Sequence, residues 1–319
     1  MERLLAHVRD GAPLPPGTLK ELCSMQALDL GGRRIGLGGA ERLEGVLWAM
    51  PKLTNLDLRD NNLGSAGAAA VARALQELTG LNSLDLSGNK LGPDGGQILV
   101  GSLSALTNLR SLHLRTNNLG TIGITSLATA IELMPFLENM SLDYNSLDAE
   151  AAGVLAQVLP RLTRLGELDL HENALGPEGA TRLAAALRGL TTIHSLYLDA
   201  NSIKTAGVVA LASALQSLTE LRELWLSENS LGMSGSAHAA AALSTHKNLA
   251  KVELDGRPND VDWAELGCNL GVDVLELGWL KVMRHIHSSL GAEGVREVLE
   301  RLKSREDAID SVHFPSSFT

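Results

Sequence analysis

The sequence predicts an α/β solenoid, an open horseshoe in which a concave parallel sheet is backed by convex helices. Three observations predict it: a repeat of fixed period, an alternation of leucines in each copy, and a helical apolar pattern after it. Segments such as LTNLDLRDNNLG (53–64) and LRSLHLRTNNLG (109–120) follow one template. The copies begin at positions 25, 53, 81, 109, 137, 165, 193, 221 and 249, a constant step of 28 residues. A period of this length without a slip indicates stacked structural units.

Each unit opens with a short predicted strand. In the LxL pattern, both leucines lie on one face of the strand and the residues beside them lie on the other. The leucine face turns inward, and the other face turns outward. An asparagine follows each strand, and its buried amide can satisfy the backbone of its own turn and of the next. We therefore expect a ladder, ending where Arg33 and Arg257 replace the asparagine. The members are Asn61, Asn89, Asn117, Asn145, Asn173, Asn201 and Asn229.

The second half of each unit is predicted to be a helix. Apolar residues recur at i, i+4 and i+7, as at Val71, Leu75 and Leu78. Glycine recurs near each predicted helix start, and alanine in the helices, which lets neighbouring helices approach closely. Paired strands lie about 4.8 Å apart, whereas packed helices need about 8–10 Å. This difference forces the sheet to the inside of a curve, and its polar outward positions leave the concave face open to solvent.

The ends of the chain depart from the repeat and divide it into three predicted parts. Residues 1–24 are expected to form an N-terminal cap, because a terminal unit cannot bury its outer face alone. Residues 25–257 form the horseshoe of about nine 28-residue units. Residues 258–319 are expected to form a helical C-terminal cap and tail. The surest cap helix is 292–304, and a homo-oligomer formed through this cap is the alternative to simple capping.

Composition excludes several classes of protein. With 37 acidic and 27 basic residues the net charge is −10, which disfavours a nucleic-acid binder that relies on overall positive charge. The two cysteines, Cys23 and Cys268, offer neither a disulfide framework nor a zinc spacing. No apolar run approaches the length of a membrane span, and the first residues have no secretory h-region. We expect a cytoplasmic chain.

The 28-residue unit resembles the ribonuclease-inhibitor subfamily of leucine-rich repeats over residues 25–257. That subfamily includes ribonuclease inhibitor, the Ran GTPase-activating protein and the C-terminal domains of NOD-like receptors. A horseshoe with a short cap before it and extra helices after it is similar to the receptor domain. The absence of the cysteines common in the relatives' repeats points to the mitochondrial member. The resemblance implies a ligand-sensing or regulatory domain of an innate-immune receptor, located in mitochondria if that member is the right one.

The sequence carries no enzyme signature. Gly232 to Ser236 faintly resembles a nucleophile elbow, but it lies in the turn where glycine recurs for structural reasons. His285 and His287 are two residues apart and so lie on different faces of a helix. We expect no catalysis, no cofactor and no metal site.

The concave face carries the residues whose identity the repeat does not fix. Its first four rows hold four acids and two arginines, and its last five hold nine acids and one lysine. Both tyrosines and one of the four tryptophans also lie there. Tyr197 and Trp225 occupy one column in adjacent strands, with an expected ring separation of about 5 Å. Exposed aromatic residues ringed by charge are typical of protein interfaces. The predicted partner-binding residues are Asp143, Tyr144, Asp169, His171, Glu172, Tyr197, Asp199, Trp225, Glu228 and Glu253.

These residues predict a protein partner with a basic surface, although acids that merely solubilise the sheet are the plainer alternative. A second hypothesis is RNA binding through Arg33, Arg34, Arg59 and Arg115, together with basic residues of the C-terminal cap. A third is activation of a GTPase, which only the resemblance to the Ran activator implies.

Overall fold

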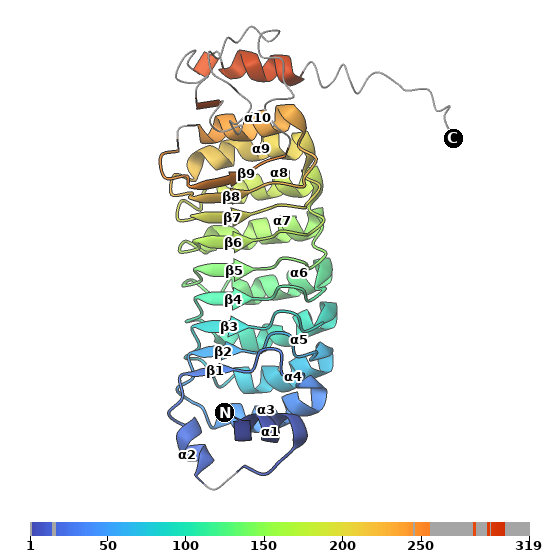
Figure 1. The fold of residues 1–319 in the computed structure, drawn as a ribbon, viewed down its shortest axis with the longest axis vertical. Coiled ribbons are helices and arrows are strands. Elements are labelled where there is room, and N and C mark those ends of the chain that lie inside the picture. The colour runs from blue at the N-terminus through green and yellow to red at the C-terminus, as the bar shows by residue number, and fades with distance from the viewer. Residues whose placement is uncertain are drawn as a thin grey trace, which may run out of the picture.

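Nine parallel strands stack in chain order into one curved sheet, with a helix after each strand from β1 to β8 (Figure 1). The computed structural model describes residues 2–14, 17–244, 246–255, 283–284, 292–293 and 295–303. The strands are β1 (Ala27–Asp29), β2 (Asn55–Asp57), β3 (Ser83–Asp85), β4 (Ser111–His113), β5 (Asn139–Ser141), β6 (Glu167–Asp169), β7 (Ser195–Tyr197), β8 (Glu223–Trp225) and β9 (Lys251–Glu253). The helices that follow them are α3 (Gly36–Trp48), α4 (Gly64–Leu75), α5 (Gly92–Ala105), α6 (Gly120–Ile131), α7 (Ala149–Val158), α8 (Gly176–Leu187), α9 (Lys204–Ser217) and α10 (Gly232–Leu243).

The predicted fold class is confirmed, and its register follows the repeat. Leu84 of β3 pairs with Leu56 of β2 and Leu112 of β4, so each residue lies beside its counterpart one repeat away. All three leucines are at most 2% exposed. The leucine face of the sheet is therefore buried against the helices, and the opposite face is open.

The asparagine ladder forms as predicted and gives the solenoid its continuity. Asn117 is fully buried. Its Nδ2 donates to the carbonyls of Leu86 and Leu114 at 2.9 and 3.0 Å. Its Oδ1 accepts from the backbone N–H of Asn89 at 3.0 Å. Each amide thus joins the turn of its own repeat to the turn of the preceding one.

An acid that the sequence placed on the concave face ends this ladder. Asp255 Oδ2 accepts from the backbone N–H of Asn229 at 3.0 Å and of Leu231 at 2.9 Å. A carboxylate oxygen supplies the acceptor that an asparagine supplies elsewhere. Arg257, the residue in the asparagine position, lies outside the described residues.

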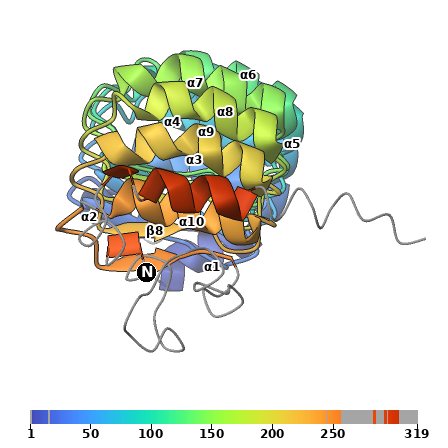
Figure 2. The ribbon, with the colours of Figure 1, turned by 90° about the horizontal axis from the view of Figure 1, so that it is seen from above.

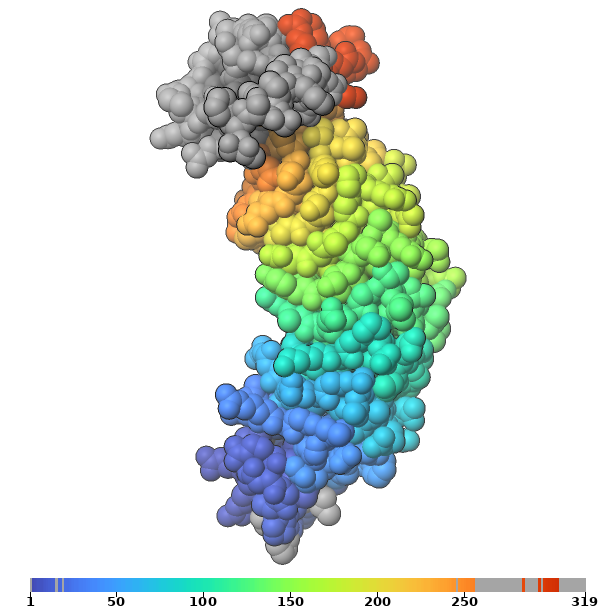
Figure 3. Space-filling model, turned by 90° about the vertical axis from the view of Figure 1, so that its right-hand side faces the viewer, coloured from blue at the N-terminus to red at the C-terminus, as the bar shows by residue number. Residues whose placement is uncertain are grey.

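The helices form one layer behind the sheet (Figure 2), and the molecule curves along its length (Figure 3). Glycines set how closely the helices approach. A Cβ on Gly96 of α5 would lie 2.9 Å from the Cα of Gly123 on α6. Only a residue without a side chain fits this contact.

Short helices cover the N-terminal end, where α1 (Glu2–Asp10) and α2 (Thr18–Leu22) precede the first repeat. Leu4 and Val8 are buried. Arg42 of α3 donates to the carbonyls of Val8 and Arg9 at 2.9 and 2.7 Å. This contact fixes α1 against the first repeat helix.

At the other end, helical residues 295–303 lie beside α10. Val295, Val298 and Leu302 are buried in a cluster with Ala237 and Ala240. The remainder of the expected 258–319 cap, apart from 283–284 and 292–293, lies outside the described residues. Within the described part of the chain, none of the helices has the length and apolarity needed to cross a bilayer.

Candidate functional site

The open face of β5 to β9, with the turn after each strand, forms the candidate site. We call it the acidic–aromatic surface and define it by Tyr144, Asp169, His171, Glu172, Tyr197, Asp199, Trp225, Glu228 and Glu253. In each strand, the residue between two inward-facing apolar residues points its side chain to the open face, because side chains alternate along a strand. In the turns, Tyr144, Glu172 and Glu228 adopt left-handed backbone angles, with φ of 54°, 51° and 59°. These three side chains are exposed, and the other members are half-buried.

Tyr144 is the most prominent aromatic of this surface, with 40% of the residue exposed. The Arg115 guanidinium lies over its ring, with Cζ 5.0 Å from the centroid. The His171 ring meets it edge to face, with centroids 5.0 Å apart and an interplanar angle of 84°. Tyr144 is therefore held in place on both sides before any partner arrives.

The structure corrects the placement of Asp143, which the sequence assigns to direct contact with a basic partner. Its side chain is fully buried, in contact with Ser141, Arg115 and His171. Ser141 Oγ donates to Oδ1 at 2.5 Å, and Arg115 Nε lies 3.1 Å from Oδ2. Burial raises the pKa of the Asp143 carboxyl. Asp143 supports Arg115 and its neighbours from below and offers no surface to a partner.

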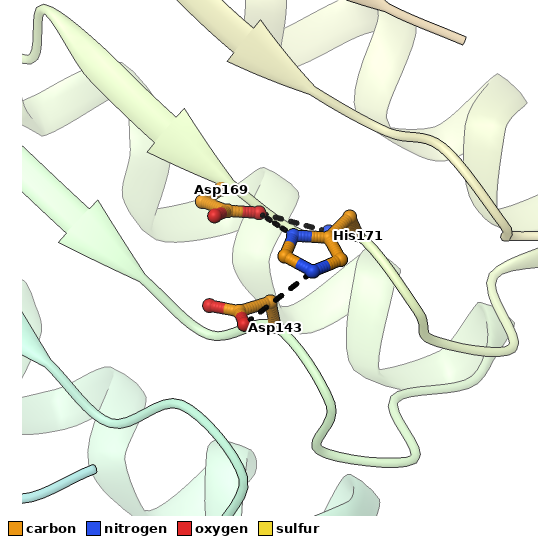
Figure 4. A group of neighbouring side chains, drawn as sticks. All are labelled: Asp143, Asp169 and His171. Carbon is orange, nitrogen blue, oxygen red and sulfur yellow. Dashed lines mark hydrogen bonds and ion pairs between the residues drawn. The ribbon is translucent and has the colours of Figure 1, made fainter. Parts of the chain in front are cut away.

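His171 joins Asp143 to Asp169 (Figure 4). Its Nδ1 lies 2.7 Å from Asp169 Oδ1, and its Nε2 lies 3.7 Å from Asp143 Oδ2. The hydrogen bond to Asp169 raises the pKa of the His171 imidazole, against the opposing effect of burial. When His171 is protonated, Arg115, Asp143, His171 and Asp169 form a chain of alternating charge.

Donor atoms of Asp143, Asp169 and His171 lie within 4.8 Å of one another, a grouping that can hold a metal ion. In this structure the same atoms already bind one another and Arg115. The Arg115 guanidinium next to Asp143 opposes a second cation there. The arrangement is that of an ion-pair network which orients Tyr144.

Tyr197 and Trp225 form the second aromatic group. They are paired residues of β7 and β8, with ring centroids 6.0 Å apart and planes tilted by 42°. Tyr197 donates its hydroxyl proton to Glu223 Oε2 at 3.2 Å. Burial raises the pKa of Tyr197 to about 12, with a further contribution from Glu223, so the phenol stays neutral. The two rings meet as the shared column predicts, slightly farther apart than expected.

Lys251 contacts Trp225 from the next strand, a contact that the sequence reasoning missed. Its Nζ lies 3.6 Å from the Trp225 ring centroid and 3.4 Å from Glu253 Oε1. Lys251 is the one lysine in the outward rows, two residues before Glu253. That position was the available signal for its role.

Three carboxylates of this surface lie in the turns after β6, β7 and β8. Within the described residues, no lysine or arginine forms an ion pair with Glu172, Asp199 or Glu228. Burial raises the pKa of Asp199, and the neighbouring Asp169 and Glu228 add to the shift. Within the described part of the chain, these three carboxylates add negative charge to the surface without a lysine or arginine to neutralise it.

Two of the four arginines of the RNA hypothesis are paired with acids, and two are exposed. Arg59 Nε lies 3.2 Å from Asp57, and Arg115 is paired with Asp143. Arg33 and Arg34 are exposed near the first repeats. Arg34 lines a cavity of about 460 Å³ at the turn edge, together with Gly36, Asp60, Asn62, Gly88 and Lys90.

Known proteins share this architecture. The Leucine Rich repeat family model matches residues 49–72, 79–100 and 105–128. Internalin C2 from Listeria monocytogenes is similar in structure, with 21% identity, a TM-score of 0.53, and coverage of 79% of this chain and 92% of that chain. By its repeats and its open parallel sheet, the chain has the leucine-rich repeat solenoid fold.

Two further solved structures are similar at lower scores. The ectodomain of the Arabidopsis receptor kinase HAESA, solved with an IDA peptide hormone, has 23% identity, a TM-score of 0.49 and coverage of 71% and 33% of the two chains. LegL7 from Legionella pneumophila has 18% identity, a TM-score of 0.44 and coverage of 88% and 98%. The comparison with curated proteins gives no match.

Proposed function

We propose that this protein is a non-enzymatic binding module and that its acidic–aromatic surface binds a protein with a basic surface. The observation that carries the proposal is the placement of three aromatic side chains on an open, acidic sheet face. Nine aromatic residues occur in the whole chain. Aromatic anchors dominate binding energy at protein interfaces, and charge complementarity steers the encounter.

The test is capture of partners from a cell lysate with the wild type and a Tyr197→Ala/Trp225→Ala variant. The matched control is Trp48→Ala, which removes an exposed tryptophan from α3 on the helical side of the molecule. A basic protein captured by the wild type and the control, and lost with the double variant, is the expected result. For that purified partner, Trp225→Ala alone should weaken binding by at least about 2 kcal/mol. Equal capture by all three forms contradicts the proposal.

For the biological setting, we propose the ligand-sensing or regulatory domain of an innate-immune receptor. The support is the resemblance of the 28-residue unit to the NOD-like receptor repeats. The same resemblance supports a cytoplasmic location, or a mitochondrial one for the mitochondrial member. A homo-oligomer formed through the C-terminal cap is part of this proposal, and its test is the molar mass of the purified chain in solution.

RNA binding is the second candidate, and one observation favours it. Arg34 and Lys90 line a single cavity at the turn edge, away from the acidic–aromatic surface. Phosphate contacts release counterions, so RNA affinity should fall steeply with salt. In the lysate experiment, partners retained by the double variant but lost after ribonuclease treatment would favour RNA. An Arg34→Ala/Lys90→Ala variant should then release them as well.

A further inference from the structure

The Trp225 ring already holds a cation in this structure. Lys251 extends from β9 so that its Nζ lies 3.6 Å from the ring centroid, within the range of a cation–π contact. The ammonium is also 3.4 Å from Glu253 Oε1. An indole face beside a carboxylate is an environment that attracts ammonium and guanidinium groups.

The neighbours of Trp225 add to this preference. Tyr197 lies beside it, with ring centroids 6.0 Å apart, and presents a second aromatic surface. The Tyr197 hydroxyl holds Glu223 at 3.2 Å, which places another carboxylate next to the aromatic pair. Two rings and two carboxylates therefore meet at one point of the open face.

Lys251 is held loosely enough to be displaced. Its side chain is 47% exposed, and that of Glu253 is 40% exposed. Exposed ion pairs and exposed cation–π contacts are both weak, because water competes for the charges. Among the described residues, the contacts of this ammonium are the Trp225 ring and Glu253.

We propose that Trp225 and Tyr197 form a binding site for a lysine or arginine side chain of the partner protein, and that Lys251 covers this site until the partner displaces it. The inference rests on the proposed function and deepens it, since it names the group that the acidic–aromatic surface recognises. Lys251 acts as an internal competitor. Its removal should therefore strengthen binding of an external cation.

The experiment measures binding of a short fluorescein-labelled oligo-arginine peptide by fluorescence anisotropy at fixed ionic strength. Lys251→Met keeps an apolar stem and removes the ammonium. Lys247→Met is the matched control, because it removes the same charge from an exposed lysine in the preceding turn. We expect Lys251→Met to bind the peptide about two- to fivefold more tightly than Lys247→Met.

A double-mutant cycle with Trp225→Leu separates competition from simple charge removal. Trp225→Leu alone should weaken peptide binding, and Lys251→Met should give little gain in the Trp225→Leu background. An equal gain from Lys251→Met in both backgrounds, or an equal gain from Lys247→Met, would overturn the inference. Absence of peptide binding even to Lys251→Met would overturn it as well.

The experiments distinguish failure of this inference from failure of the proposed function. If Lys251→Met gives no specific gain while the lysate partner is still lost with the Tyr197→Ala/Trp225→Ala variant, the inference fails and the proposed function stands. If the partner is retained by that double variant, the proposed function fails, whatever the peptide shows.

Discussion

Asn117 shows how a single residue type joins this molecule together. Its amide satisfies two carbonyls and a backbone N–H from two successive repeats, in a position that water does not reach. Buried polar groups of the backbone need such partners. The same position therefore carries asparagine in seven consecutive units. An asparagine in this column is structural, and the functional residues lie in the neighbouring columns.

His171 is the residue through which pH acts on the candidate site. Its folded pKa is raised above 6.5, chiefly by the hydrogen bond to Asp169. Protonation therefore stabilises the folded state, fully so below 6.5, and this contribution is lost as pH rises through the raised folded pKa. Deprotonation also removes the positive charge between Asp143 and Asp169.

We predict that His171→Gln lowers the free energy of unfolding more at about pH 6 than at about pH 8. Urea unfolding of the wild type and the variant at both pH values measures the difference. In an Asp169→Asn background the same comparison should be nearly flat, because the largest cause of the raised pKa is gone. A difference that grows with pH would contradict this account of the network.

At the scale of the elements, the distance between neighbouring helices is set by side-chain size. α5 and α6 meet where Gly96 faces the backbone of Gly123. A Cβ atom added to Gly96 would lie 2.9 Å from the Cα and 3.0 Å from the carbonyl oxygen of Gly123. Backbone atoms cannot move aside as the end of a flexible side chain can. A Cβ atom added to Gly101 of the same helix would meet only Gln76 Nε2, the end of a flexible side chain, at 3.9 Å. A methyl group would therefore clash at Gly96 but would fit at Gly101.

The pair gives a matched test of helix packing. Gly96→Ala should destabilise the protein by about 1–3 kcal/mol, because the added methyl group forces α5 from α6. Gly101→Ala should stabilise it by about 0.5–1 kcal/mol, since alanine restricts the unfolded chain and favours the helix. Urea unfolding of both variants decides the matter. Equal effects from the two would show that helix propensity alone is at work.

At the scale of the whole molecule, each repeat packs against its neighbours, and the apolar outer face of each terminal repeat needs a capping segment. Residues 295–303 bury Leu302 and Val298 against α10 at the C-terminal end. In a solenoid, damage at one end should loosen the nearest repeats first, because stability is passed between neighbours.

Leu302→Ala should therefore reduce the protection of amide hydrogens in α9 and α10 while α4 and α5 keep theirs. Hydrogen exchange followed by mass spectrometry measures this, and Lys303→Ala, at an exposed position, is the control. A uniform loss of protection along the solenoid would show that the repeats unfold as a single unit instead.

The charge of the whole concave face is also a property of the folded molecule. In the sequence, the last five rows of the concave face contain nine acidic residues. Asp143 is buried and Asp255 ends the asparagine ladder, so neither is free to meet a partner. The surface keeps its acidic character, with Glu172, Asp199 and Glu228 at its centre.

The sequence by itself determined the repeat, the parallel sheet, the asparagine ladder and the side of the sheet on which Tyr197 and Trp225 lie. Each of these follows from a fixed period, because residues one period apart must become neighbours. Only the tertiary structure decided the contacts between residues at different positions of the period. The burial of Asp143, the His171 bridge to Asp169, and the Lys251 ammonium over Trp225 are of this kind. They depend on how side chains share space across strands, and a linear pattern does not specify that.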